Sequence, residues 1–208
     1  MNLLAQKRSA AALFAVGALS FGLSACGSHD SADHNATDHD GTSSAARVEH
    51  NAADVSFVQG MVPHHLGALE MAELADSRAS SPEVKVLAAE IRAAQQPEID
   101  VMKGWLSQWG VAASNDDHSG HDVSAEIRGD DMPGMMSTGQ MAELEAANGA
   151  TFDTLFLELM IEHHEGAITM ATTELADGIS AAAKSLAQTI TTSQRTEVDK
   201  MKQLLTAR

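Results

Sequence analysis

The stretch FVQGMVPHHLGALEMAELA, residues 57–75, is written a second time in this chain as FLELMIEHHEGAITMATTE, residues 156–174. At this offset of 99 residues, both copies keep the string Met-x-x-His-His-x5-Met. Further identities reach Leu106 and Leu205, so one unit has been duplicated. Packing alone would preserve apolar residues, and it gives no reason to preserve paired histidines beside thioethers. The repeat therefore makes a metal site the first hypothesis, since imidazole and thioether are both metal ligands.

The apolar residues of the first copy recur at the spacing of an α-helix. Alternating steps of four and three residues separate Phe57, Met61, His64, Ala68, Met71 and Ala75. A stripe of this kind faces a partner helix. Ser81 and Pro82 are typical of an N-cap and a first helical position, so a second helix is expected to begin there. Its inward stripe comprises Val84, Leu87, Ile91, Gln95, Glu98, Met102 and Trp105.

Two helical hairpins follow from this pattern, one within residues 51–109 and one within residues 137–208. Ser137 and Gln140 have the spacing of a capping box, which predicts a further short helix at the start of the second half. Neither hairpin can bury its stripe alone. We therefore predict an all-α protein in which two antiparallel hairpins, joined by a linker at residues 110–136, pack as one four-helix bundle.

The N-terminus has the features of a signal peptide over residues 1–25. Lys7 and Arg8 precede an apolar run, residues 9–23, that is too short to be a permanent membrane span. The sequence Leu-Ser-Ala-Cys, ending at Cys26, resembles a bacterial lipobox, where the peptide is cut before a cysteine that then carries lipid. We expect an exported protein, anchored through Cys26 to the outer face of the cell membrane or in the periplasm. An ordinary signal peptide with a chance cysteine is the alternative.

Composition narrows the range of partners and ligands. Residues 26–50 are rich in Asp, Ser and His, and predict a disordered tether to the bundle at residues 51–208. The tether histidines, which could capture metal weakly or simply be solvated, are His29, His34 and His39. The net charge of −16 repels nucleic acid and attracts cations. Because Cys26 is the only cysteine, no disulfide can form within the chain, and the expected metal ligands are Met and His.

The candidate metal ligands lie on the inward faces of both hairpins, because residues three and four apart share one side of a helix. From the first copy they are Met61, His64, His65, Met71, Glu98 and Met102. From the second copy they are Met160, His163, His164, Met170, Glu197 and Met201. Imidazole with thioether suits copper, and thioether favours Cu(I), although imidazole also binds other divalent transition metals. Because imidazole binds a metal only when neutral, binding is expected to weaken as the pH falls through about 6.5.

Several of these residues also have a role that needs no metal. Met102 and Met201 have the spacing of gap-filling core residues. Glu98 and Glu197 could form salt bridges between helices. They could instead accept the outer N–H of a ligating histidine and fix its tautomer.

A family resemblance becomes specific at these residues. The paired Phe-x3-Met-x2-His-His-x-Gly-Ala-x2-Met-Ala strings, the Met-Pro-Gly-Met-Met run at residues 132–136 and the Gln-x2-Glu-Ile-x-x-Met string at residues 95–102 resemble the family called domain of unknown function 305. The resemblance covers most of residues 52–206. It implies a ferritin-like four-helix bundle, an exported location and, in some members, copper binding and copper tolerance. The functional positions it implies are His64, His65, His163 and His164 with the flanking methionines.

The leading expectation is an extracytoplasmic, membrane-tethered protein that captures, buffers or delivers copper. Its partners would be metal ions, together with a metal-exchange protein or a second copy of the chain. A ferritin-like di-metal oxidase is the first alternative, but that chemistry typically needs Glu-x-x-His. Met61 and Met160 stand three residues before His64 and His163, so an enzyme is the weaker expectation. A structural bundle that binds a partner without metal is the second alternative.

Overall fold

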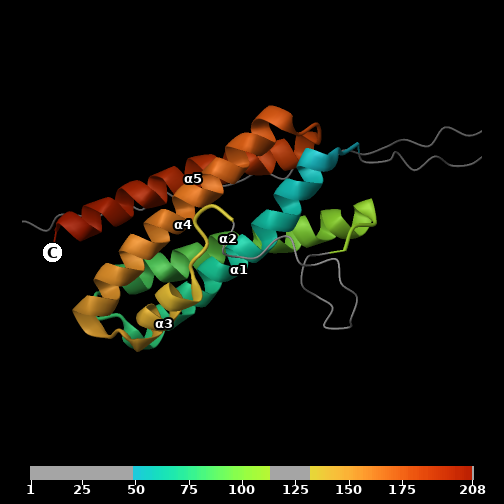
Figure 1. Cartoon of the computed structure of the whole chain (residues 1–208). Coiled ribbons are helices and arrows are strands. Elements are labelled where there is room, and N and C mark those ends of the chain that lie inside the picture. Colours follow the sequence, from blue (N-terminus) through green and yellow to red (C-terminus); the bar gives the residue numbers. More distant parts are fainter. Residues whose placement is uncertain (1–48, 113–131, 208) are drawn as a thin grey trace, which may run out of the picture. The chain divides into compact units, whose positions relative to one another are not determined.

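Five helices form the part of the chain that the computed structural model describes, residues 49–112 and 132–207 (Figure 1). They are α1 (Ala52–Arg78), α2 (Pro82–Trp109), α3 (Thr138–Ala146), α4 (Gly149–Asp177) and α5 (Ala181–Thr206). The predictions for the signal peptide, for Cys26, for the tether histidines and for most of the linker concern residues outside this description.

Helix starts follow local signals that the sequence displays. Ser81 caps α2 by accepting the amide of Val84 at 3.3 Å, with proline in the first helical position as predicted. The predicted capping box of α3 is also present, since the amide of Gln140 donates to Ser137 Oγ at 3.2 Å and the Gln140 side chain accepts from the Ser137 amide at 2.9 Å. These caps satisfy amides that would otherwise lack partners at the helix ends.

The two hairpins, α1–α2 and α4–α5, join mainly through α1 and α4. Asp54 in the first turn of α1 accepts the amide of Ser180, which lies beyond the end of α4, at 2.9 Å. Asp153 near the start of α4 accepts the amide of Ser81, which lies beyond the end of α1, at 3.0 Å. The start of each of these two helices therefore lies beside the end of the other, so α1 and α4 run antiparallel. Since Asp54 and Asp153 are themselves repeat equivalents, the duplicated halves are related by an approximate two-fold axis.

The interior contains two apolar clusters, each built from all four long helices. The first cluster takes the second half of α1, the first half of α2, the first half of α4 and the end of α5, with Leu144 from α3. The second cluster takes the opposite halves of the same long helices. The prediction of an all-α helical bundle is confirmed. The middle of every long helix lies between the two clusters, and this is where the repeated histidines fall.

Glu174 in α4 breaks the symmetry between the halves, because its repeat equivalent is Ala75. Its side chain is buried, and no amide or hydroxyl of the described residues donates to either carboxylate oxygen. Burial, followed by a hydrogen bond to Asp54 and the negative charge of Asp54, raises the pKa of Glu174 to about 8. The Glu174 carboxyl is therefore largely protonated at neutral pH.

We expect Glu174→Gln to raise the melting temperature by a few degrees at pH 8 and by much less at pH 5. In the unfolded chain this carboxyl ionises near its ordinary value of 4.5, and in the folded chain near 8. Between these values the folded state holds the extra proton, so stability falls as the pH rises, and a neutral amide removes that loss. Thermal unfolding followed by circular dichroism tests this, with the exposed Glu158→Gln as control. An equal shift of the melting temperature at both pH values would contradict the raised pKa of Glu174.

Candidate metal centre

Eight polar side chains cross the interior between the two apolar clusters, and we call them the histidine layer. They are His64 and His65 of α1, Gln95 and Glu98 of α2, His163 and His164 of α4, and Gln194 and Glu197 of α5. Each has its equivalent 99 residues away. All four histidines are at most 1% exposed. His65 and His164, which lie at the edge of the predicted stripe, are thus buried as deeply as His64 and His163.

Each hairpin holds one histidine against a glutamate of its own second helix. His65 Nε2 lies 2.7 Å from Glu98 Oε2, and His164 Nε2 lies 2.7 Å from Glu197 Oε2. In the neutral tautomer whose Nε2–H donates to the carboxylate, the Nδ1 atom carries a lone pair. Both Nδ1 atoms are buried and accept no hydrogen bond from the described part of the chain. This is the carboxylate–histidine arrangement that orients a metal ligand and fixes its tautomer.

The other two histidines meet near the approximate two-fold axis. The rings of His64 and His163 stack with their centroids 3.8 Å apart and an angle of 23° between planes. His163 Nε2 lies 2.8 Å from the carbonyl oxygen of His64, and His163 Nδ1 lies 2.8 Å from that of Gly134. Burial, and then the charge of His164, lower the pKa of His163 to about 4. The ring is therefore neutral at pH 7 and donates to only one of the two carbonyls.

The Nδ1 atom of His64 is a further buried nitrogen that can bind a ligand. Its Nε2 lies 3.1 Å from the carbonyl oxygen of Pro133, while its Nδ1 has no hydrogen-bond partner in residues 49–112 or 132–207. Burial, followed by the charge of His163, lowers the pKa of His64 well below its ordinary value. His64 therefore stays neutral, which is the form that binds a metal.

A short loop at residues 132–135, which we call the strap, precedes α3 in Figure 1 and lies against α1 and α4. Its carbonyl groups lie close to the rings of His64 and His163. The amide of Met135 donates to the carbonyl of Met132 at 3.1 Å, and Gly134 has a φ of 76°, a conformation that favours glycine. A Cβ atom on Gly166 would lie 2.0 Å from the Pro133 carbonyl oxygen. The strap can therefore dock on α4 because Gly166 has no side chain.

The strap also brings in two thioethers that the candidate ligands from the sequence do not include. Met132 and Met135 belong to the Met-Pro-Gly-Met-Met run, which contributes to the family resemblance and is the one signal for them. Met61 and Met102 pack in the second apolar cluster, and the remaining core methionines pack in the first. Those remaining methionines are Met71, Met160 and Met201. Met170 is partly exposed and packs against α1 at Gly60.

The donor atoms at this layer decide which metals it could hold. In the described ranges, no three His, Cys, Asp or Glu side chains are grouped closely enough to hold an ion. The nitrogens that remain without partners are Nδ1 of His64, His65 and His164. Imidazole nitrogen and thioether sulfur are donors of soft to borderline character, the kind that copper prefers.

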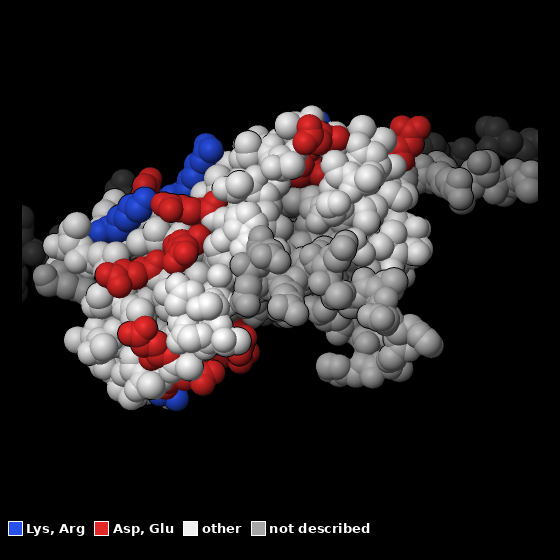
Figure 2. Space-filling view, viewed as in Figure 1, with Lys and Arg blue, Asp and Glu red and all other residues white. Residues whose placement is uncertain are grey.

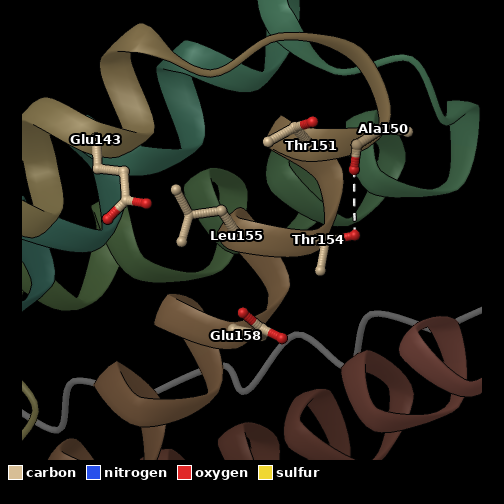
Figure 3. Close-up of a pocket in the computed structure, with 6 residues that line it drawn as sticks. All are labelled: Glu143, Ala150, Thr151, Thr154, Leu155 and Glu158. Atoms are coloured by element: carbon tan, nitrogen blue, oxygen red, sulfur yellow. Dashed lines mark hydrogen bonds between the residues drawn. The ribbon is translucent and has the colours of Figure 1, made fainter.

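A surface cavity of about 440 Å³ lies apart from this layer, between α3 and the first turns of α4 (Figure 3). Its lining residues are Glu143, Ala150, Thr151, Thr154, Leu155 and Glu158. The Thr154 hydroxyl is occupied, since it donates to the Ala150 carbonyl at 3.1 Å. None of these six described lining residues is a histidine or a methionine, so the cavity does not share the donor chemistry of the histidine layer.

The outer surface is acidic. Figure 2 shows Asp and Glu side chains spread over one face of the described residues, with fewer Lys and Arg among them. This distribution agrees with the net charge of −16 and attracts cations. None of the helices in residues 49–112 and 132–207 has the length and apolar character needed to cross a bilayer.

Comparison with known proteins identifies the family. The model of the family described as "Domain of unknown function (DUF305)" matches residues 54–205. A DUF305 crystal structure from Streptomyces coelicolor is similar, with a TM-score of 0.65 and 31% identity over 74% of this chain and 93% of that one. A DUF305 fragment from Deinococcus radiodurans has a TM-score of 0.65 and 30% identity, covering 76% and 98%.

A third similar structure was solved with a bound metal. CopM in its Cu(II)-bound form has a TM-score of 0.60 and 34% identity, covering 74% of this chain and 96% of that one. CopM was also solved in Cu(I)-bound, Ag-bound and apo forms. No curated protein matches the chain in sequence. Because the family model covers most of its length, this chain is a member of the DUF305 family.

Proposed function

We propose that this protein binds copper outside the cytoplasm, through the histidine layer, and captures, buffers or delivers it. The observation that carries the proposal is the set of three buried Nδ1 atoms, on His64, His65 and His164, that lack partners within the described residues. An unpaired polar atom in a protein interior is costly unless something binds it. Two of the three rings are also held by a glutamate, as ligating histidines commonly are.

Copper fits these donors better than metals that prefer oxygen. Neutral imidazole and thioether suit Cu(I) and Cu(II), whereas carboxylate oxygen would suit calcium or magnesium. Glu98 and Glu197 each accept from a histidine of their own hairpin. This favours an orienting role for them over direct ligation of a shared di-metal centre. The structurally similar CopM, solved with Cu(II), Cu(I) and Ag, supports the same choice of metal.

The test is a copper titration of the domain that lacks residues 1–50, against a competing chelator. Because the histidine layer lies wholly outside the deleted segment, we expect the shortened chain to keep the tight copper binding of the full chain. Binding should also raise the melting temperature, since the ion binds the folded state. Cu(I) is titrated anaerobically and Cu(II) in air. Loss of all tight binding on deletion would move the site to the tether, and no copper-dependent stabilisation in either chain would favour a structural role.

The membrane anchor belongs to the same proposal and rests on the sequence around Cys26. A lipid on this cysteine would hold the copper-binding domain at the outer face of the membrane. We expect Cys26→Ser to release the protein into the soluble fraction without changing its helical content. Retention of this variant on membranes after a high-salt wash would contradict lipid anchoring.

A further inference from the structure

The α1–α2 turn, residues 79–81, is held by a serine hydroxyl that the α4–α5 turn, residues 178–180, lacks. In the first of these turns, the Ser80 hydroxyl donates to Asp153 at 2.5 Å, beside the amides of Ser80 at 3.1 Å and Ser81 at 3.0 Å. Asp54 is the repeat equivalent of Asp153 and accepts the two matching amides of the second turn. The equivalent of Ser80, however, is Ile179, which has no hydroxyl. The second turn therefore offers Asp54 no side-chain donor at this position.

The carboxyl of Glu174 takes the place of that hydroxyl. It forms a hydrogen bond with the carboxyl of Asp54, and neither of its oxygens accepts from an amide or hydroxyl in residues 49–112 or 132–207. Because an ionised carboxylate has no hydrogen to donate, one member of this pair is a carboxylic acid. Burial opposes the ionisation of Asp54, but the hydrogen bonds that Asp54 accepts outweigh burial and lower its pKa. The proton therefore belongs to Glu174, whose O–H donates to Asp54.

The residues around this carboxyl differ between the halves in a way that makes room for it. A Cβ atom on Gly178 would lie 2.2 Å from Glu174 Oε1, so the carboxyl occupies space that a side chain at position 178 would fill. The repeat equivalents of Glu174 and Gly178 are Ala75 and Ala79. In both halves a side chain donates to the aspartate, but only in the second half can that donor lose its proton.

The charged groups that face Glu174 come from three helices. Burial, and then the hydrogen bond and charge of Asp54 in α1, raise the pKa of Glu174 to about 8. Lys184 in α5 opposes this shift, and Asp177 in α4 adds to it. Lys184 Nζ donates to the Gly178 carbonyl at 3.1 Å, so its charge lies at the same turn. When the turn opens, the Glu174 carboxyl reaches water and ionises near its ordinary value of 4.5, so opening between these pH values releases a proton.

We propose that the pair formed by Glu174 and Asp54 makes the attachment of the α4–α5 turn to α1 sensitive to pH, whereas the α1–α2 turn stays attached over the same range. Opening of the α4–α5 turn releases one proton, so it becomes easier as the pH rises toward 8 and levels off above that value. Ala183, just beyond this turn, packs in the second apolar cluster, so a released turn loosens that end of the cluster. The histidine layer lies in the middle of the helices, and the proposal does not depend on copper binding.

Amide hydrogen exchange tests the proposal, because each turn donates a serine amide to its aspartate. After correction for the intrinsic exchange rate, the protection of the Ser180 amide should fall by up to about tenfold per pH unit from about pH 5.5 to about pH 8, and then level off. The Ser81 amide is the internal control. Exchange is also measured in low urea, because exchange that urea does not accelerate reports opening of the turn alone. If Ser180 protection does not change with pH, or changes only through urea-sensitive unfolding of the whole protein, the proposal is wrong.

A variant that gives the second turn the chemistry of the first is the sharpest comparison. It combines Glu174→Ala, Gly178→Ala and Ile179→Ser, so that a hydroxyl replaces the carboxylic acid as the donor to Asp54. Protection of the Ser180 amide should then no longer change with pH. Glu174→Gln, whose amide also donates without titrating, should behave in the same way, and circular dichroism checks that both variants fold. The exposed Glu158→Gln should keep the parental pH dependence.

The carboxyl itself gives a direct measurement. In 13C-labelled protein, the side-chain carboxyl signal of Glu174 is identified by its absence from Glu174→Gln, and it should titrate with a midpoint near 8. A midpoint near the ordinary value of 4.5 would show that the proton is not held between Glu174 and Asp54. PH-dependent protection of Ser180 that persists in Glu174→Gln would show that another group causes it. Either result overturns the proposal and leaves the copper-binding function untouched.

Discussion

His64→Ala combined with His163→Ala is expected to lower the Cu(II) affinity at pH 7 by about 100-fold or more, since even outer-shell changes cost 10- to 100-fold. The ring centroids of His64 and His163 lie 3.8 Å apart, and both residues are at most 1% exposed. Competition titration with a chelator measures the loss. His50→Ala is the control, because His50 stacks on Trp109 outside the histidine layer. Equal affinities for the parent and the double variant would show that the two histidines serve packing.

The same titration repeated across pH tests how burial acts on these rings. An ordinary imidazole would make copper binding weaken near pH 6.5. Burial lowers the pKa of His163 to about 4 and that of His64 well below its ordinary value. Protons therefore compete with the metal at these two rings only at lower pH, and the part of the Cu(II) affinity that the double variant loses should stay nearly level from about pH 8 to about pH 5.5. If this difference between the parent and the double variant falls steeply near pH 6.5, burial does not hold the two rings neutral.

Gly166→Ala and Gly67→Ala are expected to change stability in opposite directions, although the two glycines are repeat equivalents. A Cβ atom on Gly166 would overlap the Pro133 carbonyl oxygen at 2.0 Å, so the strap must move or detach. Overpacking of this kind typically costs about 1–3 kcal/mol. A Cβ atom on Gly67 meets its nearest neighbour at 3.5 Å, which is ordinary contact. Alanine there should gain up to about 1 kcal/mol from its higher helix propensity.

Chemical denaturation measures both changes in the free energy of unfolding. Hydrogen exchange of the amides at residues 132–137 gives an independent measure, because a detached strap exchanges faster. Gly67→Ala should leave this exchange unchanged. A Gly166→Ala variant with parental stability and parental exchange would mean that the strap does not rest on α4.

Local signals were enough to predict the elements and their pairing. Ser81 with Pro82, and Ser137 with Gln140, are caps whose partners lie within one helical turn, so the sequence displays both sides of each interaction. The stripe through Phe57 and Ala75 indicates the buried face of α1 because helical spacing is regular. The duplication then indicated that the second half would repeat the first.

The candidate site was only partly predictable, because its contacts join residues far apart in the chain. The four histidines, Glu98 and Glu197 lie in one layer, but nothing local reveals that His64 and His163 stack on each other. The strap was missed because its docking depends on an atom that Gly166 lacks. Gly67 is the repeat equivalent of Gly166, yet a Cβ atom there would have no comparably close neighbour.

The methionines also show what the sequence alone could not predict. Helical spacing places Met71 and Met170 at equivalent positions, so the sequence treats them alike. Their surroundings differ, since Met71 is fully buried in the first apolar cluster, whereas Met170 is only partly buried on the second cluster and lies against Gly60, whose repeat equivalent is Leu159. Which methionines fill the core, and which lie beside the strap, is therefore decided by the opposite hairpin.

The reciprocal caps formed by Asp54 and Asp153 have a consequence for how the protein unfolds. Each hairpin's turn receives its cap from the first helix of the other hairpin. Neither half can therefore unfold without leaving amides of the other half unsatisfied, which couples the two halves into one cooperative transition. The same arrangement would suit a symmetric dimer of single hairpins. With both copies on one chain, the association is intramolecular, and stability no longer depends on protein concentration.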